Sequence, residues 1–113
     1  MEIIELIRRD DIDLDVTLTD ADGIAINLTN QTVMFTLKEN INDPDEDAII
    51  QKRIVNHTAP TQGKTRVVLT HEDTDISAKY YFYDLQVINH TGKVSSVPKG
   101  QIRIMQDITV KAS

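Results

Sequence analysis

The stretch "DISAKYYFYDLQV", residues 75–87, decides between two all-β architectures. A turn leads into a strand in which every second residue is apolar: Tyr81, Tyr83, Leu85 and Val87. At this kind of turn, sandwich folds place a tyrosine corner, a buried tyrosine whose hydroxyl bonds back to upstream backbone. The sequence therefore predicts a sandwich strand here, with Tyr81 as the corner residue and Tyr83 as the second candidate.

The same alternation of apolar and polar residues recurs on both sides of this stretch and indicates further strands with one buried face. Upstream, strands are expected over 3–8, 12–19, 32–40, 49–55 and 65–70. Downstream, "KVSSV" at 93–97 and "QIRIMQDITV" at 101–110 are expected to be separate strands because Pro98 and Gly100 lie between them. The segment 49–55 alternates poorly, which favours an edge position.

The turns between these strands have recognisable signals. Asp20-Ala21-Asp22-Gly23 predicts a hairpin turn, with Gly23 supplying the positive φ that a tight turn needs. An acidic loop surrounds Pro44. "THEDTDIS", residues 70–77, predicts one helical turn with Thr70 as its N-cap.

Helical periodicity is almost absent, so no helix is expected to cover a parallel sheet. Two antiparallel sheets must then bury each other's inner faces. The prediction is an all-β, immunoglobulin-like antiparallel β-sandwich of seven to nine strands, formed by residues 1–113 as a single domain. A barrel is the alternative.

The composition of the chain disfavours several classes of binding partner and several kinds of site. The chain has 12 basic and 18 acidic residues and a net charge of −6, which disfavours nucleic acid and anionic membranes as partners. It contains no cysteine, so neither a disulfide framework nor a thiolate metal site is expected. The N-terminal residues lack the pattern of a signal peptide, and no segment has the length and apolarity of a membrane span.

No catalytic motif is recognisable, and the chain is not expected to be an enzyme. Calcium is the cofactor to weigh, because hard cations bind clustered oxygen ligands. The weak metal candidates are Asp20, Asp22, Asp43, Asp45 and Asp47. Asp11, Asp13 and Asp15 alternate along one strand face, about 7 Å apart, too far to share one ion. A solvated acidic face is the preferred interpretation, and no cofactor is expected.

Outward-facing residues form the candidate interaction surface: Asp11, Asp13, Asp15, Tyr80 and Phe82. Carboxylates on an outer strand face discourage aggregation and can also steer a basic partner. Exposed aromatic rings can stack on sugars, so a carbohydrate-binding or adhesion module is one alternative function. A calcium-dependent interaction domain is another.

Five motifs in order make the sequence resemble a phage protein family. They are the opening "RRDD" followed by an alternating strand, the turn "DADG" leading into "NLTNQTVMFTLKEN", the loop "DPDEDAIIQK", the turn "LTHEDT" and the strand "YYFYDLQV". The stretch "GKVSSVPKGQIRI" follows them. This order, over residues 8 to about 106, is similar to that of the immunoglobulin-like N-terminal domain of phage baseplate upper proteins and related small tail proteins.

The resemblance implies a structural role and no catalytic residues. The chain is then expected to be a virion component, made in the bacterial cytoplasm, that docks onto other tail or baseplate proteins. Homo-oligomers are expected because phage tails are built from repeated copies.

Overall fold

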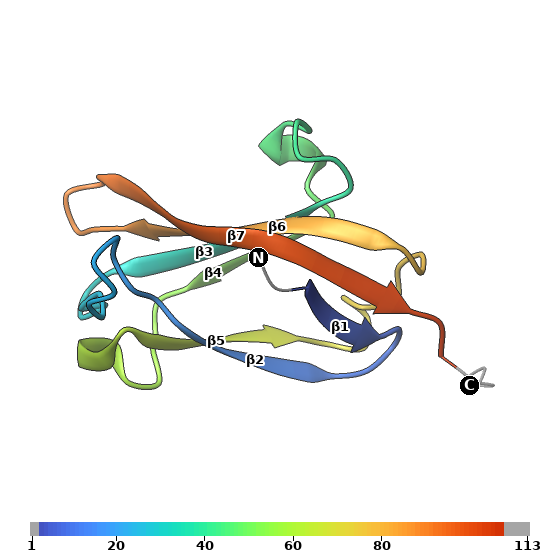
Figure 1. Ribbon diagram of the computed structural model, residues 1–113, viewed down its shortest axis with the longest axis horizontal. Helices are drawn as coiled ribbons and strands as arrows, with labels where there is room; N and C mark the ends of the chain where they lie inside the picture. Colours follow the sequence, from blue (N-terminus) through green and yellow to red (C-terminus); the bar gives the residue numbers. More distant parts are fainter. Residues whose placement is uncertain (1–2, 108–113) are drawn as a thin grey trace.

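Figure 1 shows the computed structural model, which describes residues 3–107, apart from the side chains of residues 96–99. The strands in this part are β1 (Ile3–Ile7), β2 (Ile12–Thr17), β3 (Thr32–Lys38), β4 (Ile50–Ile54), β5 (Lys64–Leu69), β6 (Tyr80–Ile88) and β7 (Val94–Met105). Two short 3-10 helices, η1 (Asp45–Asp47) and η2 (Pro60–Gln62), lie in the connecting loops.

The strands form two layers. The larger sheet has the strand order β1-β7-β6-β3-β4, and β2 pairs with β5 in a two-stranded sheet. In Figure 1 the β2–β5 pair lies below the larger sheet. The predicted all-β sandwich of immunoglobulin-like type is confirmed, and β4 lies at a sheet edge as its poor alternation suggested.

Alternating residues of both sheets fill the core, as the strand pattern predicts. Buried hydrophobic side chains come from nearly every strand and include Leu6, Val33, Phe35, Leu37, Val67, Leu69, Tyr81, Leu85, Val87, Ile102 and Ile104. On β2, Leu14 and Val16 are half-buried while Asp13 and Asp15 are exposed. Burial of the apolar members is the main stabilising contribution to the fold.

The prediction of purely antiparallel sheets is wrong at one edge. β1 runs parallel to β7, with Ile3 opposite Gln101 and Ile7 opposite Met105. Alternation determines which face of a strand is buried, but it contains no information about the direction of its neighbour. A parallel pair needs a long connection, and here almost the whole domain separates the two strands.

The predicted break at Pro98 and Gly100 is also wrong, because β7 is one continuous strand from Val94 to Met105. Tyr83 pairs with Gly100 but Leu85 pairs with Val97, so β7 advances three residues where β6 advances two. This β-bulge leaves one residue out of the ladder, which lets a strand contain a proline without losing a regular pair. The expected continuation over 108–110 lies outside the described residues.

The predicted turns form. Gly23 has φ 79 and its N–H donates to the Asp20 carbonyl at 3.0 Å, closing the hairpin turn. Thr70 and Asp73 bond reciprocally: the Asp73 N–H donates to the Thr70 hydroxyl at 3.2 Å, and the Thr70 N–H donates to the Asp73 carboxylate at 2.9 Å. The segment after Thr70 is a hydrogen-bonded turn and not a regular helix.

Candidate functional site

Tyr81 forms the tyrosine corner. Its side chain is buried, and its hydroxyl donates to the Ser77 carbonyl oxygen at 2.7 Å. Burial raises the pKa of Tyr81. Tyr83 has a different role, since its ring stacks on Phe35 at 6.0 Å between centroids and covers Gly100 on the neighbouring strand. The structure therefore assigns different roles to Tyr81 and Tyr83, the first and second candidates for the tyrosine corner.

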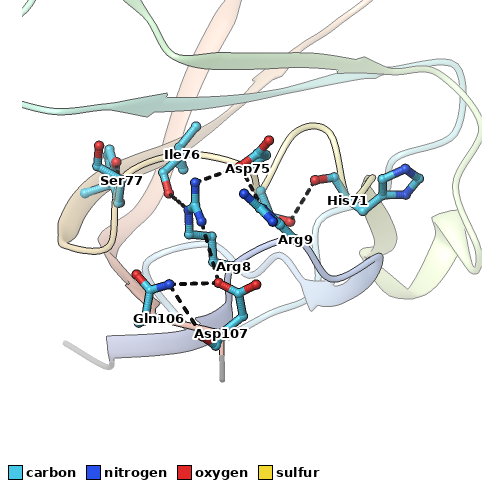
Figure 2. Close-up of polar contacts among 10 residues, drawn as sticks. Arg8, Arg9, His71, Asp75, Ile76, Ser77, Gln106 and Asp107 are labelled. Carbon is cyan, nitrogen blue, oxygen red and sulfur yellow. Dashed lines mark hydrogen bonds and ion pairs between the residues drawn. The ribbon is translucent and has the colours of Figure 1, made fainter. Parts of the chain in front are cut away.

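A cluster of charged side chains, the Arg8 clasp (Arg8, Arg9, Asp75 and Asp107), lies beside this corner. Figure 2 shows the Arg8 guanidinium between Asp75, at 2.9 Å, and Asp107, at 3.6 Å. Arg8 Nε also donates to the Ile76 carbonyl at 2.9 Å. The clasp joins the end of β1, the β5–β6 loop and the residues after β7.

Arg9 completes the clasp in an unusual backbone conformation. It has φ 69, which is uncommon for a non-glycine residue. Its N–H donates to the Thr74 carbonyl at 3.3 Å, and its side chain lies 3.2 Å from Asp75. The two arginines are adjacent in the sequence, but the carboxylate that they share, Asp75, lies 66 positions after Arg9, and no local pattern indicates it.

The acidic residues of the β2 region are not free carboxylates. Asp11 accepts hydrogen bonds from the His71 backbone N–H at 2.6 Å and from the His71 ring at 3.0 Å, and these bonds lower the pKa of Asp11. Arg66 of β5 bonds Asp15 at 2.7 Å, which lowers the pKa of Asp15, and lies 4.0 Å from Asp13. Cross-strand partners thus offset part of the negative charge.

The structure divides the candidate interaction surface into two. Asp13 and Asp15 face solvent from the two-stranded sheet. Tyr80, which is 48% exposed, and the half-buried Phe82 lie on the outer face of the five-stranded sheet. Outer faces of two packed sheets point in opposite directions, so a single partner surface cannot include both sets.

The weak metal candidates do not converge. Asp20 Oδ1 accepts the N–H groups of Asp22 and Ile24 at 2.9 and 3.0 Å, so it stabilises the turn. Asp43 accepts the Asn40 N–H, and Asp45 pairs with Lys38. Within residues 3–107, no group of three histidine or acidic side chains is placed to hold a metal ion.

A hollow of about 410 Å³ lies on the outer face of the five-stranded sheet. In Figure 1 the loop that contains η1 rises above this face. The hollow is lined by sheet residues and by the base of that loop: Thr36, Lys38, Ile41, Phe82, Tyr83, Asp84, Gly100 and Gln101. Phe82 belongs to it and Tyr80 does not, although the two rings share a strand face.

Two polar side chains that line the hollow, Lys38 and Thr36, have partners within the protein. Lys38 is held by Asp45 at 2.8 Å, and this bond raises the pKa of Lys38. Thr36 is nearly buried, and its hydroxyl accepts a long 3.5 Å bond from Gln51. Concave sites of this size, with apolar walls and a few polar groups, are typical of small-ligand pockets.

His57 has a structural role. Its ring bridges the Thr65 hydroxyl, at 2.8 Å, and the Gln31 carbonyl, at 2.7 Å. A ring nitrogen that faces a carbonyl must carry the proton, so the neutral tautomer has hydrogen on Nε2 and accepts from Thr65 through Nδ1. Both nitrogens are therefore engaged within the protein.

No protein-family model and no curated protein matches this sequence. Among solved structures, the fold is similar to the soluble domain of PmoD from Methylocystis sp., with a TM-score of 0.52 and 6% sequence identity. The match covers 88% of this chain and 76% of that chain. At such low identity the likeness shows a shared fold alone.

The described part of the chain contains no candidate for a membrane-spanning helix. No helix within residues 3–107 has the length and apolarity needed to cross a bilayer.

Proposed function

We propose that this chain is a non-enzymatic structural module of a phage virion, which docks onto other proteins of the tail or baseplate. The order of five motifs over residues 8 to about 106 carries the proposal, because each motif alone is common in sandwich folds and their order is not. No nucleic acid and no membrane is part of this proposed role.

The geometry supports this role through the outer face of the five-stranded sheet. No second sheet packs on this face in the described residues, and it exposes the apolar side chains of Ile3, Ile7 and Tyr80 by 43–48%. Ile41, in the adjoining loop, is 55% exposed. Apolar groups gathered on an uncovered face are typical of protein–protein contacts. A docking module for virion proteins needs such a surface and no reactive centre.

Protein identification in purified phage particles tests the proposal. Particles are banded on a density gradient, and their proteins are quantified by mass spectrometry against the major tail protein. The chain should be present in a fixed ratio to that protein in every intact fraction. A chain that stays in the host lysate and is absent from intact particles would contradict the proposal.

Carbohydrate binding is the second candidate function, and the hollow at Phe82 favours it. An aromatic wall can stack on a sugar ring while the hydroxyl of Thr36 and the amide of Gln101 bond its hydroxyl groups. Lys38 and Asp84 have opposite charges, which suits a neutral saccharide better than a charged one.

The two rings Phe82 and Tyr80 provide a matched test on an array of neutral glycans. Phe82→Ala should weaken binding about tenfold, since it removes the wall of the hollow. Tyr80→Ala removes a more exposed ring outside the hollow and should leave binding unchanged. Equal losses for both variants, or no binding by the wild-type chain, would exclude a saccharide site in the hollow.

A further inference from the structure

β1 lies at an open edge of the five-stranded sheet. In the part of the chain that the structure describes, it pairs with β7 and with no other strand. The Arg8 N–H, just after β1, donates to the Met105 carbonyl at 2.9 Å. In a strand, the backbone N–H and C=O groups of alternate residues point to the same side. The backbone groups of the even-numbered residues of β1 therefore point toward β7, and those of the odd-numbered residues point away from it. The odd-numbered residues are Ile3, Glu5 and Ile7, and of these the Ile7 carbonyl also accepts a hydrogen bond from the Asp10 N–H at 3.3 Å.

The side chains of this edge are also unprotected. Ile3 is 47% exposed and Ile7 is 43% exposed, both on the outer face of the sheet. Natural edge strands usually avoid pairing by means of lysine, proline, a bulge or a covering loop. Within residues 3–7, β1 has no lysine and no proline, its register with β7 is unbroken, and it carries one charge, on Glu5.

We propose that β1 is the interface of a two-fold symmetric dimer, in which β1 strands of two copies pair antiparallel about Glu5 and join their sheets. The sequence of β1, Ile-Ile-Glu-Leu-Ile, has the same apolar pattern in both directions from its central residue. An antiparallel pair centred on Glu5 places Ile3 opposite Ile7 of the second copy on the outer face. On the inner face it places Ile4 opposite Leu6.

A two-fold dimer needs a self-complementary surface, and the symmetric pattern of β1 provides one, so a second copy of the chain fits this edge. Glu5 lies 3.2 Å from Arg103 of β7, so the dimer contains the row arginine, glutamate, glutamate, arginine, with a net charge of zero. The two central glutamates repel each other at this position. Each chain also has a net charge of −6, so added salt should strengthen the association by screening repulsion between the copies.

Cysteine cross-linking tests both the dimer and its register, since the chain contains no cysteine of its own. Residues opposite each other in such a pair have Cα atoms about 5.5 Å apart, within disulfide range. Glu5→Cys should therefore form a covalent dimer on mild oxidation. Ile3→Cys alone should not, because its two copies would lie about 13 Å apart, but a mixture of Ile3→Cys and Ile7→Cys should.

Sedimentation supplies the second readout. Ile3→Lys and Ile7→Lys place charges on exposed positions of the edge and should weaken association at least tenfold without unfolding the chain. Val68→Lys is the matched control, because Val68 is 53% exposed on β5, which belongs to the other sheet. Glu5→Gln should strengthen the dimer about threefold by removing the like-charge pair.

Three results would overturn the proposal. They are a wild-type chain that remains monomeric at its highest soluble concentration, equal cross-linking by Val68→Cys and Glu5→Cys, and equal weakening by all three lysine variants. None of these measurements uses phage particles, so the dimer and the virion role can fail separately.

Discussion

Gly63 and Leu18 are in direct backbone contact: the Leu18 N–H donates to the Gly63 carbonyl at 2.8 Å. A Cβ atom on Gly63 would meet the Leu18 carbonyl oxygen at 2.5 Å, closer than real Cβ contacts come. Gly63 also has φ 71. The contact joins the residue after β2 to the residue before β5, so this glycine lets the two strands approach each other at this end of the two-stranded sheet.

Gly63→Ala is therefore expected to destabilise the protein by about 3 kcal/mol, from the left-handed backbone and the backbone clash together. Gly23→Ala is the matched control. Gly23 has φ 79, but nothing lies within 4 Å of its Cβ position, so the cost should be about 1 kcal/mol. Urea unfolding gives both values. Equal losses would show that contact with Leu18 does not matter.

Tyr81→Phe tests the tyrosine corner. The variant keeps the buried ring and removes the hydroxyl that donates to Ser77, so the free energy of unfolding should fall by about 1.5 kcal/mol. Tyr80→Phe changes an exposed hydroxyl and should cost less than about 0.5 kcal/mol. If the two variants are equally stable, the Ser77 bond contributes nothing.

Arg8 and Asp75 should be energetically coupled. Arg8→Ala also removes the bond to the Ile76 carbonyl, and we expect a loss of about 2 kcal/mol in unfolding free energy. In a double-mutant cycle with Asp75→Ala, the coupling should be about 0.5–1 kcal/mol because the pair is partly exposed. Arg66→Ala, which breaks a more exposed pair, serves as the control. Additive losses at Arg8 and Asp75 would contradict the clasp.

Asp73 should make stability sensitive to acid. Burial alone would raise the pKa of Asp73, but hydrogen bonds from Lys52 and Thr70 lower it below the ordinary value of 3.8. A lowered folded-state pKa stabilises the protein above pH 3.8, and this contribution is lost as pH falls through the folded-state pKa. Asp73→Asn should thus be less stable than wild type near neutrality, with a difference that shrinks below pH 3.8. A difference independent of pH would rule out this linkage.

Much of the fold could be predicted from the sequence because alternation reports directly which face of a strand is buried. In the segment 32–40, alternation predicts a strand with one buried face, and Val33, Phe35 and Leu37 on that face are buried. Tyr81 could be predicted because a turn followed by a tyrosine on the inner face is a local pattern. The direction of β1 relative to β7 could not, since it depends on residues 98 positions apart in sequence.

The site was less predictable for a related reason. The partners Arg66 and His71 of the acidic residues follow from the register between β2 and β5, which no local pattern specifies. The hollow depends on how the loop with η1 lies over the sheet, and this loop has no periodicity to read. The sequence predicts that Phe82 and Tyr80 both face outward, but only the folded chain shows that Phe82 lines the hollow and Tyr80 does not.

Immunogold electron microscopy of intact phage particles tests the central claim most directly. An antibody against this chain should label the tail or baseplate of every particle, at a constant position along the tail axis. Particles that carry no label, while the same antibody detects the folded chain in the host lysate, would contradict the assignment of this sandwich domain to the virion.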